Sequence, residues 1–80
     1  MTIRLLAFGI ARDILGGAET TIDLPDDATV ETLRAQLYAA YPELTKLRSL
    51  AIARNNQYAN ENEVITAQDE VVLIPPVSGG

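Results

Sequence analysis

Two runs of apolar residues lie near opposite ends of the chain, and each has the length of a β-strand. The first extends almost without interruption from Ile3 to Phe8, and the second covers Val71 to Ile74. A near-continuous apolar run of this length is typical of a strand that is covered on both faces. We therefore expect the two strands to lie side by side and parallel in the centre of one sheet.

A helical repeat occupies the middle of the chain. Val30, Leu33 and Leu37 recur at helical spacing, so they share one face. Thr29 can accept a hydrogen bond from a free backbone N–H at the start of a helix, and Pro42 disfavours helix in the residue before it. These signals predict one main helix that begins after Thr29 and ends before Pro42, where a short helical turn follows.

The remaining segments complete a sheet. Residues 19–24 alternate between polar and apolar and predict a half-buried strand beside the first, and residues 50–54 predict another strand. Asn55-Asn56 is typical of a turn, after which residues 57–59 form a weaker strand. With the helix packed across one face, this order predicts an α+β fold of the β-grasp (ubiquitin-like) type, with a mixed sheet within residues 1–74.

Composition excludes several classes of function. The chain has 80 residues, enough for one domain, with 11 acidic and 6 basic residues and a net charge of −5. Nucleic-acid binding requires the opposite sign of charge, so no nucleic acid is expected as a partner, and a basic protein fits better. The chain has no cysteine and no histidine. We therefore expect no disulfide, no thiolate or imidazole metal site and no cysteine nucleophile.

The first apolar run does not indicate targeting to a membrane. It is far shorter than the ~20 residues that a membrane span needs. Arg12-Asp13 interrupts the apolar stretch, and no clear cleavage site follows. We expect a cytoplasmic protein that has no membrane partner.

Internal candidates for catalysis are few. The acidic ones are Asp26-Asp27, Asp69-Glu70 and the pair Glu61 and Glu63. None has the ligand spacing and central glycine of a calcium loop, and each falls where a solvated turn is expected. Gly16-Gly17 lacks the lysine and hydroxyl residue of a phosphate loop and precedes a strand. We therefore expect ordinary turns at these places and no catalytic side chain within the domain.

The chain ends in a segment that differs from the rest: Pro75, Pro76, Val77, Ser78, Gly79 and Gly80. The two prolines remove two N–H donors and keep the segment from extending the sheet. Fully extended, six residues reach about 20 Å, and the two glycines can enter a narrow channel. A frayed, glycine-rich end would have the same composition. The position directly after a buried strand favours an extended functional tail over residues 75–80.

With this ending, the chain resembles the small subunit of molybdopterin synthase, a ubiquitin-like sulfur carrier with a C-terminal diglycine. The resemblance covers the whole chain, and the ending is its specific part. It rests on Leu5-Leu6-Ala7-Phe8-Gly9, Arg12, Gly16, Val30-Glu31-Thr32-Leu33, Asp69-Glu70-Val71 and Pro75-Pro76-Val77-Ser78-Gly79-Gly80.

The resemblance implies that Gly80 carries the chemistry. An activating enzyme adenylates its carboxylate with ATP, a sulfur donor converts it to a thiocarboxylate, and the resulting 1-thioglycine is the working form. The tail then enters the large synthase subunit and gives its sulfur to cyclic pyranopterin monophosphate in molybdenum cofactor biosynthesis. The resemblance thus implies a non-catalytic subunit with no bound cofactor, and it places the catalytic residues on the large subunit.

The resemblance also implies which residues face the partner. Carried over by position, the family's partner-facing surface comprises Phe8, Arg12, Tyr58, Ile74 and the tail. For Phe8 and Ile74 a core position is the alternative, because apolar strand residues are usually buried. The assembly that the resemblance implies is a heterotetramer of two large and two small subunits.

Three other functions are open to such a chain. A sulfur carrier for thiamine thiazole synthesis shares the fold and the diglycine, although Pro75-Pro76 and a length of 80 residues favour the pterin pathway. A ubiquitin-like modifier would attach Gly80 to protein lysines. A plain interaction domain would not be activated at all. The fate of the terminus separates these functions, because each predicts a different product.

Overall fold

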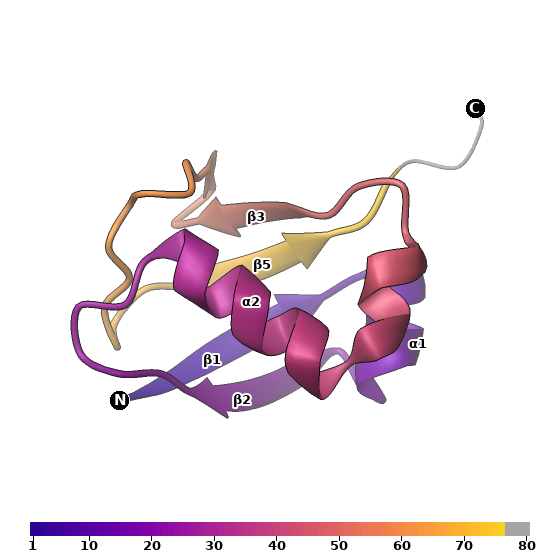
Figure 1. Cartoon of the computed structure of the whole chain (residues 1–80), viewed down its shortest axis with the longest axis horizontal. Coiled ribbons are helices and arrows are strands. Elements are labelled where there is room, and N and C mark those ends of the chain that lie inside the picture. The colour runs from indigo at the N-terminus through magenta and orange to yellow at the C-terminus, as the bar shows by residue number, and fades with distance from the viewer. Residues whose placement is uncertain (77–80) are drawn as a thin grey trace.

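The computed structural model describes residues 1–76, which form a five-stranded sheet with one main helix lying across one of its faces (Figure 1). Within these residues the elements are, in chain order, β1 (Thr2–Ala7), α1 (Gly9–Leu15), β2 (Glu19–Asp23), α2 (Val30–Ala40), the 3₁₀ turn η1 (Pro42–Lys46), β3 (Ala51–Arg54), β4 (Gln57–Tyr58) and β5 (Val71–Ile74).

The strands are ordered β2-β1-β5-β3-β4 in the sheet. β1 and β5 are neighbours and run parallel, with Leu6 opposite Val72, whereas the other strand pairs are antiparallel. A parallel pair needs a long crossover connection, and here the chain between the two strands includes α2. This is the β-grasp arrangement. The predicted fold class and the central position of the two apolar strands are therefore confirmed.

The main helix forms where the sequence signals predict it. The Thr29 hydroxyl oxygen accepts a hydrogen bond from the Thr32 N–H at 3.3 Å, which caps the first turn of α2. Val30, Leu33 and Leu37 are fully buried and belong to one core with the apolar side chains of the sheet. Burial of this helical face holds α2 against the sheet.

The described residues leave one face of the central strands uncovered, so the expectation that both faces are buried is wrong. Successive side chains of a strand point to opposite faces. On one side they are buried in the core: Ile3, Leu5, Ala7, Val71 and Leu73. On the other side Leu6, Val72 and Ile74 are only partly buried. The reason is that a single helix layer can cover only one face of a sheet. We call the second side the open face.

Two turns depend on a left-handed backbone. Asn55 and Asn56 have φ of 54° and 71°, which is the combination that a tight two-residue hairpin turn requires. The turn predicted at these residues is confirmed. Gly16 has a φ of 85° and ends α1, and its N–H donates to the Arg12 carbonyl oxygen at 3.0 Å. These turns determine where α1 and β3 end.

No helix within residues 1–76 has the length and apolar character needed to cross a membrane. The same residues contain no group of three or more His, Cys, Asp and Glu side chains that could hold a metal ion.

Candidate functional site

The open face of the sheet carries a largely apolar groove of about 390 Å³. The residues that line it are Leu6, Phe8, Ala53, Asn56, Tyr58, Glu70, Val72 and Ile74. They come from β1 with the residue after it, from the β3–β4 hairpin and from β5 with the residue before it, so segments from both ends of the chain meet here. We call this feature the sheet groove.

The groove forms because large side chains lie beside small ones on the open face. β5 presents Val72 and Ile74 to this face, whereas β3 presents Ala53 and Ala51 opposite them. Directly opposed side chains in a sheet have Cβ atoms about 4.5–5.5 Å apart, so a small residue leaves a hollow beside a larger neighbour. Ala53, opposite Val72, lines the groove and therefore helps to shape it.

Two aromatic residues of the groove are strongly exposed. Phe8 has 58% of its surface accessible and Tyr58 has 75%. Single exposed apolar residues are ordinary on a protein surface, but a contiguous apolar patch marks an interaction site. Aromatic side chains are also enriched in protein–protein interfaces. The composition of the groove is therefore that of a docking surface.

β5 leads directly from the sheet groove into the tail. Ile74 is the last residue of β5, and Pro75 and Pro76 follow outside the sheet. Gly9 lies against Pro75, since a Cβ atom at position 9 would be 3.4 Å from the Pro75 Cγ atom. The tail residues Val77, Ser78, Gly79 and Gly80, for which the sequence predicts the reactive end, lie outside the described residues.

The structure brings together three of the four residues that the sequence predicts to face a partner: Phe8, Tyr58 and Ile74. The fourth, Arg12, is exposed on α1 and does not line the groove. Its N–H donates to the Phe8 carbonyl oxygen at 3.3 Å, so it lies one helical turn beyond the end of β1. That these four residues contact a partner stays a prediction.

Sequence reasoning missed five of the groove residues: Leu6, Ala53, Asn56, Glu70 and Val72. A signal existed, because Leu6 and Phe8, like Val72 and Ile74, are apolar residues two positions apart. Such pairs lie on the same face of a strand. In a continuous apolar run this signal is hidden, because the side facing the core and the side facing solvent have the same composition.

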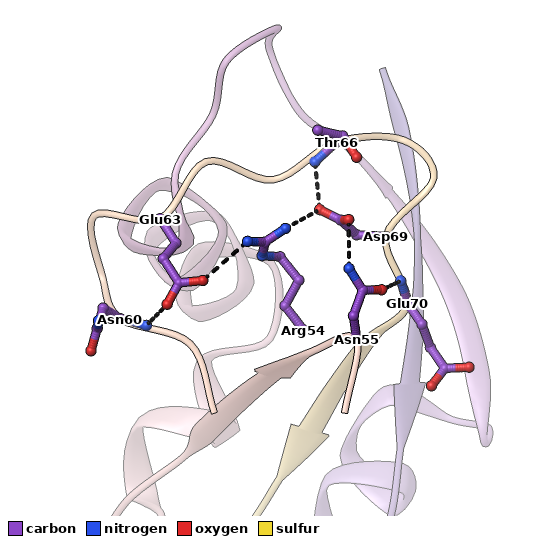
Figure 2. Close-up of polar contacts among 7 residues, drawn as sticks. All are labelled: Arg54, Asn55, Asn60, Glu63, Thr66, Asp69 and Glu70. Carbon is purple, nitrogen blue, oxygen red and sulfur yellow. Dashed lines mark hydrogen bonds and ion pairs between the residues drawn. The ribbon is translucent and has the colours of Figure 1, made fainter. Parts of the chain in front are cut away.

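A polar cluster ties the loop between β4 and β5 to the end of β3 (Figure 2). The Arg54 guanidinium, at the end of β3, forms ion pairs with Glu63 and Asp69, each at 3.2 Å. Asp69 also accepts hydrogen bonds from the Thr66 N–H at 2.8 Å and from the Asn55 side-chain amide at 2.9 Å. The expectation that Glu63 and Asp69 are ordinary solvated turn residues is therefore wrong. Both carboxylates tie the loop to the sheet.

These contacts shift the ionisation of the charged groups. The pKa of Glu63 lies below its usual value, because the Asn60 N–H and then Arg54 form hydrogen bonds to the ionised carboxylate. Burial raises the pKa of Asp69, whose side chain is only 8% exposed, but the hydrogen bonds that it accepts outweigh burial and the net shift is downward. The same two carboxylates raise the pKa of Arg54. The ion pairs are therefore fully formed at neutral pH.

The cluster supports one rim of the sheet groove. The Asn55 side-chain oxygen accepts a hydrogen bond from the Glu70 N–H at 2.9 Å, and the Asn55 N–H donates to the Glu70 carbonyl oxygen at 2.9 Å. Glu70 lines the groove, and so does Asn56, the neighbour of Asn55. The charged side chains of this cluster thus have a structural role, because they hold the loop that borders the groove.

The chain is similar over nearly its whole length to known proteins. Residues 5–80 match the ThiS family. A curated relative from Chlamydomonas reinhardtii, a molybdopterin synthase sulfur carrier subunit, is 39% identical over 83 residues, and the match covers 100% of both chains.

Two solved structures share the fold over the whole of both chains. SAMP1 from Haloferax volcanii, a small archaeal modifier protein, has a TM-score of 0.84 at 28% identity, with 100% of each chain covered. A chain from the complex of subunits 1 and 2 of the molybdopterin-converting factor of Helicobacter pylori 26695 has a TM-score of 0.68 at 28% identity, again with 100% of each chain covered.

Proposed function

The chain belongs to the ThiS family, among relatives of the molybdopterin synthase sulfur carrier subunit, and we propose that it carries sulfur on its C-terminal Gly80 to a large synthase subunit. The observation that carries this proposal is the continuity of groove and tail. One strand, β5, supplies Val72 and Ile74 to the sheet groove and then leads into Pro75. The chain thus provides a docking surface and a reactive terminus, and the large subunit provides the catalytic side chains.

The cycle begins with activation, because a free carboxylate is a poor acyl donor. An activating enzyme joins the Gly80 carboxylate to the AMP portion of ATP, and pyrophosphate leaves. Hydrosulfide released by a sulfur donor then attacks the carbonyl carbon, AMP leaves, a proton is lost, and a terminal thiocarboxylate (1-thioglycine) forms. A thiocarboxylate ionises more readily than an ordinary thiol, so its sulfur is nucleophilic at neutral pH.

Delivery follows in the active site of the large subunit. The sulfur of the thiocarboxylate attacks a carbon of cyclic pyranopterin monophosphate and displaces an oxygen substituent of that carbon, which leaves as water or as a phosphate oxygen. Water then cleaves the acyl–sulfur bond. The sulfur stays on the pterin and Gly80 returns to a carboxylate. Pro75 and Pro76 cannot continue the sheet, and a glycine at position 79 keeps the chain narrow beside the reacting atoms. The carrier itself needs no bound cofactor in this cycle.

The large subunit docks on the sheet groove in this proposal. Phe8, Tyr58 and Ile74 offer apolar and aromatic contact area, and Arg12 offers a cation that can pair with an acidic group of the partner. The similar chain from H. pylori, which belongs to a complex of subunits 1 and 2, supports such a partner. We expect an assembly of two large and two small subunits.

The experiment uses the chain with one alanine added after Gly80. Intact mass is measured after incubation with ATP, an activating enzyme of this pathway and hydrosulfide. We expect the wild-type chain to gain the mass difference between sulfur and oxygen. The extended chain should gain nothing, because its Gly80 is blocked as a peptide. Gln68→Ala, a change at an exposed loop residue, is the control and should be converted like the wild type.

Melting curves of both variants complete the test. Changes away from the core usually alter stability by less than about 0.5 kcal/mol, so both variants should melt like the wild type. An extended chain that accepts and delivers sulfur as well as the wild type would end the proposal. A plain interaction domain predicts a different result, in which neither the wild type nor the extended chain gains sulfur.

Protein modification is the second candidate function, favoured by the likeness to SAMP1. In that case the amine of a protein lysine attacks the activated Gly80 carbonyl, the activating group leaves, and an isopeptide bond forms. A covalent adduct in place of the sulfur-containing product would favour this function. A carrier for thiazole synthesis is loaded in the same way, so it is distinguished at the next step, by incubating the loaded chain with the pterin and with the thiazole precursor.

A further inference from the structure

A second groove, of about 450 Å³, lies between α1 and η1. Its lining combines aliphatic and charged side chains: Ile10, Asp13, Ile14, Glu43, Lys46 and Leu47. Ile10 is 49% exposed, and Ile14 and Leu47 beside it are partly buried. The aliphatic side chains thus form a contiguous surface. We call this feature the end groove.

The spacing of residues in α1 and η1 explains this surface. Ala11 of α1 and Leu44 of η1 are buried in the core. Ile10 and Ile14 are four residues apart, so they share another face of α1, and that face lines the end groove. Of the larger aliphatic side chains of α1, Ile14 and Leu15 pack partly against the core, and Ile10 is left at the surface.

The end groove lies next to the start of the tail. Gly9, the residue before Ile10, lies against Pro75, because a Cβ atom at position 9 would be 3.4 Å from the Pro75 Cγ atom. Figure 1 shows α1 at the end of the sheet where β5 ends. Phe8 and Ile10 therefore flank the point where the chain leaves the sheet. One belongs to the sheet groove and the other to the end groove.

The length of the tail limits where its receiver can lie. The six residues after Ile74 reach about 20 Å when extended, so a protein that encloses Gly80 must stand against this end of the molecule. A specific interface usually involves about 20–30 residues on each side, and the sheet groove has only eight lining residues. A contact of that size extends past the sheet groove, and the end groove adjoins the sheet groove across Gly9.

We propose that the end groove is a contact surface for the enzyme that activates Gly80, an inference that rests on the proposed function. The occupant is an apolar side chain of that enzyme flanked by basic residues. The lining has two carboxylates, Asp13 and Glu43, against one ammonium group, Lys46, and the whole chain has a net charge of −5. A basic partner therefore fits, and a second copy of this acidic chain does not.

The first test compares Ile10→Ser with Val64→Ser. Val64 is a matched control, because it is 46% exposed but lines neither groove. KM and kcat are measured for pyrophosphate release by the activating enzyme with ATP and the full chain. We expect Ile10→Ser to raise KM about fivefold, the effect of no longer burying roughly half of an isoleucine side chain, and to leave kcat unchanged. Val64→Ser should change neither constant.

The second test concerns charge and does not depend on the aliphatic side chain. Asp13→Lys should raise KM most at low salt, because it places a cation opposite the basic groups of the enzyme. Asp13→Glu keeps the charge and should behave like the wild type. Melting curves of all variants are the control for folding, and we expect each variant to melt like the wild type.

Three results would overturn the inference. If Ile10→Ser is activated with the same KM as Val64→Ser and Asp13→Lys has no salt-dependent effect, the inference fails while the proposed function stands. If only binding to the large subunit is weakened, or if Ile10→Ser changes the oligomeric state in gel filtration, the groove serves a different partner. If the wild type itself is not activated, the proposed function and this inference fail together.

Discussion

At the scale of single residues, Gly9 joins the sheet groove to the start of the tail. Its φ is +56°, a region that costs a residue with a side chain roughly 1–2 kcal/mol. Carbon atoms pack best at about 3.5–4.0 Å, and a Cβ at position 9 would be 3.4 Å from the Pro75 Cγ atom. Gly16 has a φ of +85°, but a Cβ there would meet no atom within 4 Å. It therefore offers a control for backbone strain alone.

We predict that Gly9→Ala and Gly16→Ala lose similar stability, about 1 kcal/mol each, but differ in function. Gly9→Ala should slow conversion of Gly80 to the thiocarboxylate, because the added methyl group would contact the Pro75 ring, at the short end of van der Waals distances, where the chain leaves the sheet. Urea denaturation and a time course of intact mass measure the two effects. Adding Pro75→Ala to Gly9→Ala removes the ring and should restore the rate. Equal rates for the two glycine variants would show that Gly9 serves only the backbone.

Some residue contacts could be predicted from the sequence and others could not. The Thr29 cap depends on a residue three positions away, so a local pattern reveals it. Arg54 and Asp69 are 15 residues apart in the chain, and Arg34 and Glu61, whose side chains meet at 2.6 Å, are 27 apart. The path of the loop determines these pairs, and no local pattern encodes that path. For this reason the sequence wrongly predicts that Glu63 and Asp69 are ordinary solvated turn residues.

At the scale of elements, the sequence predicts the helix and the strands because each has a local signal. Helical spacing defines α2, the turn at Asn55-Asn56 separates β3 from β4, and apolar composition pairs β1 with β5. The apolar composition of β1 and β5 could not show that one face of these two strands is open. Leu6 and Val72 look like core residues in the sequence, and only the single helix layer reveals that they are not.

Two leucine-to-alanine changes test this difference between the faces. Leu37→Ala empties a fully buried position under α2 and should cost about 2–5 kcal/mol, a large part of the ~5–15 kcal/mol that stabilises a typical domain. Leu6 lies on the open face, and part of its side chain is already in contact with water. Leu6→Ala should therefore lower the free energy of unfolding by less than half as much as Leu37→Ala. Urea unfolding measures both. Equal costs would contradict an open face in the isolated chain.

At the scale of the whole molecule, acidic charge has two opposing effects. A net charge of −5 disfavours the compact state through self-repulsion, whereas the ionised forms of Glu63 and Asp69 hold a loop in place. Folding lowers the pKa of both groups below their ordinary values of 4.5 and 3.8. Their contribution to stability is therefore present above these ordinary values and is lost as the pH falls through the lowered values.

We predict that Asp69→Asn destabilises the chain at about pH 7 and progressively less as the pH falls below the ordinary value of 3.8. The wild type loses the charge of Asp69 over this range, whereas the variant has none to lose, so its free energy of unfolding should depend less on pH. Urea unfolding at about pH 7 and at about pH 2 measures the difference. Asp26→Asn is the control, because Asp26 is exposed and forms no ion pair among residues 1–76; its effect should be small at both pH values. A cost for Asp69→Asn that is the same at both pH values would show that hydrogen bonds alone, and not its charge, hold the loop beside the sheet groove.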